Sequence, residues 1–163
     1  MKKVIVTFAA VFLFGANSVF AAPINNLEKG VTAGGIISGS NNSIYYLETQ
    51  NTDKLTLGIQ YLDLRTNDSA TDFYAQIKMD DTLRVIFGNR IINSHSKAYL
   101  GGAVESHLNP DVDGYASLIA GNGFQELQMG VNYKLTDAND INLNFSSLSD
   151  NKSSIGIGLG FKF

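Results

Sequence analysis

The last residues of the chain alternate strictly between large apolar side chains and residues that are almost all glycine. The apolar positions are Ile155, Ile157, Leu159, Phe161 and Phe163, and the positions between them are Gly156, Gly158, Gly160 and Lys162. A period of two predicts an extended strand with two different faces. Glycine weakens a strand interior and gives a packed core nothing to bury. The surroundings of this strand must therefore accommodate large apolar side chains on one face and almost no side chains on the other.

The same alternation recurs along the chain. It is clearest in residues 55–61, 73–79, 83–91, 127–135 and 141–146. It is weaker in residues 30–38, 43–50 and 114–120, and Ile86 interrupts the polar face of its own run. No helical periodicity competes with it after residue 21, so we expect an all-β domain.

Clusters of Asn, Asp, Ser, Gly and Pro separate these runs, as turn-forming residues do. The clusters are residues 38–43, 51–54, 65–72, 79–82, 92–97, 109–114, 121–126, 136–140 and 148–153. These nine connectors predict ten strands.

The N-terminus has the pattern of a cleaved secretory signal. Lys2 and Lys3 precede an apolar stretch, Val4–Ala16, and the small residues Val19 and Ala21 have the spacing that a signal peptidase recognises. The apolar stretch is shorter than the ~20 residues that a membrane-spanning helix needs. We therefore expect a signal peptide over residues 1–21 and a single domain over residues 22–163.

Composition excludes several classes of function. The formal net charge is −3, and cleavage would make it more negative by removing two lysines, so no basic surface for nucleic acid is expected. The chain has no cysteine, which excludes a disulfide framework and thiolate metal sites.

Two architectures give every strand one apolar and one polar face. A soluble barrel packs its apolar face into a dense core, whereas a membrane barrel turns that face to lipid and keeps small or polar groups inside. Frequent glycine on the polar face favours the membrane barrel, because glycine leaves room in a narrow lumen for long side chains of neighbouring strands.

Leu159→Arg should then block insertion, because residue 159 would face lipid, whereas Gly158→Ser, on the lumen face, should be tolerated. Eight strands are the alternative, if the first weak pair does not cross the membrane.

A signal-like N-terminus, alternating strands and the ending "GIGLGFKF" resemble the small outer-membrane β-barrel proteins of bacteria with two membranes. Within these proteins, the length of the chain and its pattern of strands are similar to those of the opacity-type and YfaZ-type porin-like families. The resemblance implies a transmembrane antiparallel up-and-down β-barrel with short loops, surrounded by outer-membrane lipid. It also implies that Ile157, Leu159, Phe161 and Phe163 form the signal recognised by the barrel-assembly machinery.

The parity of the strands predicts the topology. With both termini in the periplasm, the connectors facing outside are residues 38–43, 65–72, 92–97, 121–126 and 148–153. The longest of them, residues 65–72, faces outward, as the longer loops of such barrels do.

The phase of each strand predicts which charges face the lumen. They are Lys78, Arg84, Arg90, Glu105, His107, Lys134 and Lys162, with Glu126 near a mouth. Five cations against one or two carboxylates would favour anions in a water-filled path. Alternatively, these side chains pair with one another and fill the interior, because a barrel of eight strands is just filled.

Three functions follow from these alternatives. The first is a porin-like barrel with a narrow polar lumen for ions or very small solutes. The second is a structural or surface-interaction barrel with a filled lumen and no transport. The third and most remote is a lipid-modifying enzyme. The pleat places Ser106 opposite His107, and Glu105 with His107 lacks a third ligand nearby. We therefore expect no catalytic, cofactor or metal site.

Overall fold

The computed structural model describes residues 24–25, 30–38, 42–64, 68–148 and 153–163. The expected signal peptide, residues 1–21, lies outside them. Ten strands account for nearly all of the described chain. They are β1 (Gly30–Ser38), β2 (Ser43–Gln50), β3 (Leu55–Leu64), β4 (Asp68–Lys78), β5 (Leu83–Ile92), β6 (His95–Asn109), β7 (Val112–Gly121), β8 (Phe124–Lys134), β9 (Asn139–Leu148) and β10 (Ser153–Lys162).

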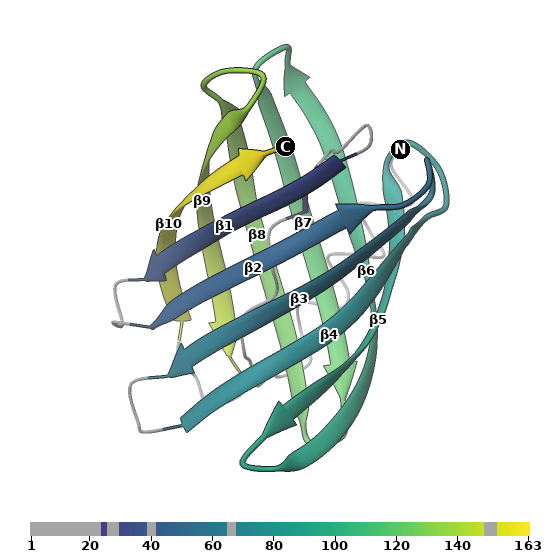
Figure 1. Cartoon of the computed structure of the whole chain (residues 1–163), viewed down its shortest axis with the longest axis vertical. Coiled ribbons are helices and arrows are strands. Elements are labelled where there is room, and N and C mark those ends of the chain that lie inside the picture. The colour runs from purple at the N-terminus through teal and green to yellow at the C-terminus, as the bar shows by residue number, and fades with distance from the viewer. Residues whose placement is uncertain (1–23, 26–29, 39–41, 65–67, 149–152) are drawn as a thin grey trace.

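The ten strands form one closed antiparallel barrel (Figure 1). Each strand pairs with the next in sequence, and β10 pairs with β1 to close the barrel. The prediction of an up-and-down barrel of ten strands is confirmed, and the eight-strand alternative is wrong. We call the end where β1 begins and β10 finishes the terminal end. In the described residues, no helix is long and apolar enough to cross a membrane.

Several predicted connectors are shorter than expected. β4 already begins at Asp68 and β8 at Phe124, so the connectors predicted over residues 65–72 and 121–126 shrink to a few residues. The expectation of a longer outer loop over residues 65–72 is wrong. Asn, Asp, Ser and Thr are typical of turns between strands. In this barrel they also lie on the polar, lumen-facing side of the strand ends.

The two faces of the strands have the predicted orientation. In β10 the apolar residues point outward, with Ile157 60% exposed and Leu159 50% exposed, whereas the glycines between them are buried. Exposed aromatic residues lie near both ends of the apolar exterior, where transmembrane barrels place them, and Phe73 and Phe87 are exposed at mid-strand. Tyr45 and Tyr61 are paired towards the end opposite the termini, and Phe161 lies near the terminal end.

Lumen glycines make room for inward-pointing tyrosines. Tyr74 is paired directly with Gly58 on the neighbouring strand, and Tyr99 is paired in the same way with Gly88. In both pairs a Cβ on the glycine would overlap the tyrosine ring. Tyr46 over Gly34 and Tyr115 over Gly130 repeat the arrangement. The predicted role of glycine, making space for the long side chains of neighbouring strands, is confirmed.

This packing predicts that Gly58→Ala destabilises the barrel. The new methyl group would push the Tyr74 ring, which is buried and hydrogen-bonded to Glu48, out of its position. Overpacking of this kind costs on the order of 1–3 kcal/mol. The matched control is Gly102→Ala, because the nearest atom to a Cβ there is 3.6 Å away. Urea unfolding followed by circular dichroism should separate the two variants, and equal stabilities would contradict the packing argument.

One expectation about the glycine face is wrong. A Cβ at Gly158 would lie 2.7 Å from the Gly35 carbonyl oxygen and 2.8 Å from an Ile36 side-chain carbon. The carbonyl belongs to the backbone of β1 and cannot move aside cheaply. Gly158→Ser is therefore disfavoured by steric contact, although residue 158 faces the lumen.

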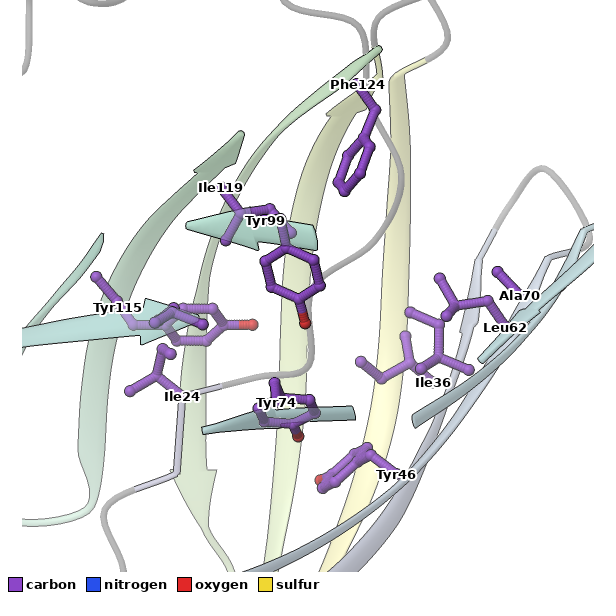
Figure 2. Close-up of a cluster of buried hydrophobic side chains, with 13 residues drawn as sticks. Ile24, Ile36, Tyr46, Leu62, Ala70, Tyr74, Tyr99, Tyr115, Ile119 and Phe124 are labelled. Atoms are coloured by element: carbon purple, nitrogen blue, oxygen red, sulfur yellow. The ribbon is translucent and has the colours of Figure 1, made fainter. Parts of the chain in front are cut away.

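The lumen also contains an apolar patch that was not expected. Ile36, Ile44, Leu62 and Ala70 are directly paired in succession across β1 to β4, and all four are nearly inaccessible. They lie in the half of the barrel away from the termini. Figure 2 shows Ile36, Leu62 and Ala70, from β1, β3 and β4, together on one side of the lumen, with the inward-pointing tyrosines beside them. The interior thus combines buried polar groups with buried apolar and aromatic side chains.

Candidate functional site in the barrel lumen

Most buried polar residues of the protein face the lumen. They include Thr32, Glu48, Gln60, Asp72, Gln76, Arg84, Arg90, Glu105, Ser117, Glu126, Gln128, Asn132, Asp140, Asn142, Asn144 and Ser146. In a barrel whose outer face is apolar, this interior is the place where polar chemistry is concentrated.

A cluster around Arg90 crosses the lumen. The Arg90 guanidinium donates to both carboxylate oxygens of Asp72, at 2.7 and 2.5 Å, and to Glu126 at 3.2 Å. Gln60 donates to Asp72 at 2.7 Å. Arg90 lies in β5 and Glu126 in β8, with β6 and β7 between them in the sheet. The contact therefore joins strands that are not neighbours, and we call these four residues the Arg90 cluster.

The Arg90 cluster is sealed from solvent. The side chains of Arg90, Asp72 and Glu126 have no exposed surface. The guanidinium carbon lies 4.8 Å from the centre of the Phe124 ring and 5.9 Å from that of Tyr99. Contacts of a guanidinium with aromatic faces and carboxylates stabilise its charge where water is absent. The cluster lies in the half of the lumen away from the termini.

A second ion pair lies along the wall nearer the terminal end. Arg84 donates from Nε and from a terminal nitrogen to one carboxylate oxygen of Glu105, at 3.0 and 2.7 Å. Both side chains are buried. Because β5 and β6 are neighbours, this pair follows the wall and does not bridge the lumen.

The carboxylate of Glu48 is held by neutral groups. It accepts hydrogen bonds from the Tyr74 hydroxyl at 2.8 Å, from the Gln76 amide at 3.0 Å and from the Asn25 amide at 2.8 Å. Glu48 is almost fully buried. We call Glu48, Tyr74 and Gln76 the Glu48 site.

Asparagines form a chain of hydrogen bonds on the opposite wall. Asn144 donates to Asn142 and Asn142 donates to Asn132, each at 2.6 Å. Asn142 also donates to the Tyr115 hydroxyl at 3.0 Å. The amide of Asn132 then donates to the Ile24 carbonyl at 2.7 Å. Together with the Glu48 site, this chain positions two polar side chains against the segment before the first strand.

The predicted lumen lysines lie at the terminal rim. Lys78 pairs with Asp81 at 3.4 Å, Lys134 with Asp137 at 2.7 Å, and Lys162 with Asp140 at 3.3 Å. The hydrogen bond from Lys134 lowers the pKa of Asp137, which lies in an exposed turn. These lysines therefore do not supply isolated positive charge inside the barrel.

His107 does not line the lumen. Its side chain is 63% exposed at the rim, where it contacts Asp113 of β7. His107 is still paired in register with Asp113, as Glu105 is with Tyr115, and the strand becomes irregular only after His107. His107 is therefore exposed because it lies at the end of the regular pairing, beyond the lumen wall. In the part of the chain that the structure describes, no three His, Asp or Glu residues are grouped as a metal site would require.

The predicted balance of charge in the lumen is also wrong. Only two of the predicted cations, Arg84 and Arg90, are buried, whereas five carboxylates are buried: Glu48, Asp72, Glu105, Glu126 and Asp140. The sequence reasoning missed Glu48 because its strand alternates weakly. It missed Asp72 and Asp140 because both were placed in connectors. Continuing the alternation Asp72, Tyr74, Gln76 backwards along β4 would have placed Asp72 inside.

A closed up-and-down barrel with an apolar exterior and buried polar groups in its interior is typical of a transmembrane β-barrel. Comparisons with solved structures agree on this fold. The chain is similar to the KdgM porin, with 10% identity, a TM-score of 0.55, and coverage of 82% of this chain and 99% of that chain. It is also similar to the outer-membrane protein Omp33 of Acinetobacter baumannii, with 9% identity, a TM-score of 0.52, and coverage of 85% and 100%. No protein-family model and no curated protein sequence matches the chain.

Proposed function

We propose that this protein is a porin-like barrel of a bacterial outer membrane that passes small cations and very small polar solutes through a narrow, hydrated lumen. Its similarity in fold to the KdgM porin and to Omp33 supports the class. The excess of buried carboxylates over guanidiniums supports a preference for cations rather than the anions favoured by the sequence analysis.

The observation that carries a hydrated lumen is a set of buried polar atoms that the described protein groups do not satisfy. Both polar atoms of the Gln128 side chain, the Ser117 hydroxyl and the Thr32 hydroxyl have no hydrogen-bond partner among the described residues. Each unsatisfied buried group costs about 1–3 kcal/mol. Small side-chain movements that let water reach these groups are therefore favourable, and water in the lumen is the medium that ions require.

The test is a planar-bilayer measurement on the mature full-length chain. We expect small, steady conductance steps, with a reversal potential shifted towards potassium in a potassium chloride gradient. Asp140→Asn should weaken that shift, because it leaves Lys162 uncompensated at the terminal mouth. Asp137→Asn is the matched control: it also removes the carboxylate partner of a rim lysine, but the Asp137 side chain is 99% exposed whereas that of Asp140 is 4% exposed. Solvent and salt screen an exposed charge, so this control should leave selectivity unchanged.

Silence from folded, inserted protein would favour the second function, a structural barrel with a filled lumen. One observation supports that alternative: the Arg90 cluster joins β5 to β8 across the interior. The lipid-modifying enzyme stays the most remote alternative, since no observation in the described residues favours it. Membership in the opacity-type or YfaZ-type families stays a prediction.

We also propose that the barrel-assembly machinery recognises the ending Ile157, Leu159, Phe161 and Phe163. These side chains are exposed on the outer face of β10. Deletion of Phe163 should leave unfolded chains in the periplasm. The deletion also removes two backbone hydrogen bonds between Phe163 and Val31 that help to close the barrel.

Phe163→Ala separates recognition from closure because it keeps both backbone hydrogen bonds. If recognition depends on the aromatic side chain, Phe163→Ala should accumulate in the periplasm almost as strongly as the deletion. The control is Ile155→Ala, which removes another exposed apolar group from the other end of β10. Normal yield of folded Phe163→Ala in the outer membrane, measured by fractionation and heat modifiability, would contradict the recognition role.

A further inference from the structure

We propose that Ile24 and Asn25 form an intramolecular plug, bound inside the lumen between Asn132 and the Glu48 site. The binding of this segment is independent of the proposed function. Its effect on passage rests on the proposed function, because a plug matters only where something passes.

The two residues connect opposite walls of the barrel. The Ile24 carbonyl accepts a hydrogen bond from the Asn132 amide at 2.7 Å, and the Asn25 amide donates to the Glu48 carboxylate at 2.8 Å. Asn132 lies in β8 and Glu48 in β2, with β9, β10 and β1 between them around the barrel. Two adjacent residues thus span the lumen from one wall to the other.

The side chain of Ile24 is buried as well. It is 2% exposed and belongs to the cluster that contains the inward-pointing tyrosines. Figure 2 shows Ile24 beside Tyr115, with Tyr74 and Tyr46 on the other side of the lumen. The segment is therefore held by an apolar contact as well as by two hydrogen bonds, which is how a specific ligand is bound.

The partners of the segment are held in place by other residues. The Asn132 side-chain oxygen accepts from Asn142, which leaves its amide group directed at Ile24. The Glu48 carboxylate is fixed by Tyr74 and Gln76. A site whose groups are already oriented loses little entropy on binding, so two hydrogen bonds and one side chain can suffice.

The plug is joined covalently to the barrel. Only residues 26–29 separate Asn25 from Gly30, the first residue of β1 at the terminal end. A short tether gives an effective concentration in the millimolar range, so weak contacts keep the segment bound. Ile24 and Asn25 lie outside all ten strands. They can therefore leave the lumen without breaking the hydrogen bonds between strands.

Thiol labelling tests the binding directly, because the chain has no cysteine. In the mature, folded protein, Ile24→Cys should react with a membrane-impermeant maleimide much more slowly than Thr52→Cys in the exposed turn between β2 and β3. Asn132→Ala should speed labelling of residue 24 by about tenfold, the change expected for one hydrogen bond. Asn144→Ala is the matched control, because Asn144 donates to Asn142 and not to Ile24.

Planar-bilayer recording of the same variants tests the effect on passage. Asn132→Ala should raise the mean conductance several-fold, and Asn144→Ala should not. Labelling of Ile24→Cys as fast as Thr52→Cys would overturn the binding. Faster labelling with unchanged, measurable conductance would overturn the plug. If labelling follows the expected pattern and no variant conducts, the binding stands and the proposed function fails.

Discussion

Replacing Leu159 by arginine should prevent most chains from reaching the folded state in the membrane. Leu159 is half exposed on the outer face of β10, and its neighbours across both seams are Gly35 and Ile141. Neither neighbour can pair with a guanidinium, so the charge would meet hydrocarbon. Arginine on the lipid face of a barrel costs about 2–4 kcal/mol at mid-membrane depth, a large part of the stability of a small domain.

The measurement is membrane fractionation followed by heat modifiability, with unfolding in urea for any folded fraction. Leu159→Ala is the first control, because it removes the apolar side chain and adds no charge. Thr52→Arg is the second, because it places the same charge in an exposed turn. Insertion of Leu159→Arg at the yield of Leu159→Ala would show that residue 159 does not face lipid.

The barrel could be predicted from the sequence because the two environments of each strand act on neighbouring residues. A strand with one face in lipid and one in a narrow lumen must alternate residue by residue, as the ending of the chain does. The pairing of Tyr74 with Gly58 on the neighbouring strand has the same cause, because a narrow lumen has room for a large side chain only beside a small one. The number of strands, their up-and-down order and the two faces of the strongly alternating strands therefore followed from the pattern.

The ends of the strands could not be predicted in the same way. A polar residue near a turn faces the lumen as readily as it forms the turn, and both environments suit Asn, Asp, Ser and Thr. Asp72, Glu126 and Asp140 were all placed in connectors or near a mouth for this reason. All three are buried in the lumen, and with Glu48 they reverse the expected balance of buried charges.

Contacts across the lumen could not be predicted from the alternation of residues either. Phase indicates which residues point inward, but the distance between β5 and β8 depends on the radius and tilt of the closed barrel. The bond between Arg90 and Glu126 depends on that distance. Ile24 and Asn25 precede the first strand and have no periodicity, so nothing in the sequence placed them in the lumen.

The second large effect is expected at Arg90. Arg90→Met keeps much of the volume of the side chain but leaves Asp72 and Glu126 buried without their cation. Removing one partner of a buried ion pair costs about 3–5 kcal/mol, because the remaining charge is desolvated and uncompensated. The chain has no tryptophan, so unfolding in urea is best followed by circular dichroism and by heat modifiability.

A triple variant separates charge from packing at the same site. Arg90→Met combined with Asp72→Asn and Glu126→Gln removes all three charges together, and it should recover most of the stability lost by Arg90→Met alone. Arg84→Met is a useful comparison, because it leaves the single carboxylate of Glu105 on one wall and should cost less than Arg90→Met. If the triple variant is no more stable than Arg90→Met, the cost at this position comes from lost packing against Phe124 and Tyr99. Recovery would instead mean that the three charges hold β4, β5 and β8 together as one electrostatic unit across the lumen.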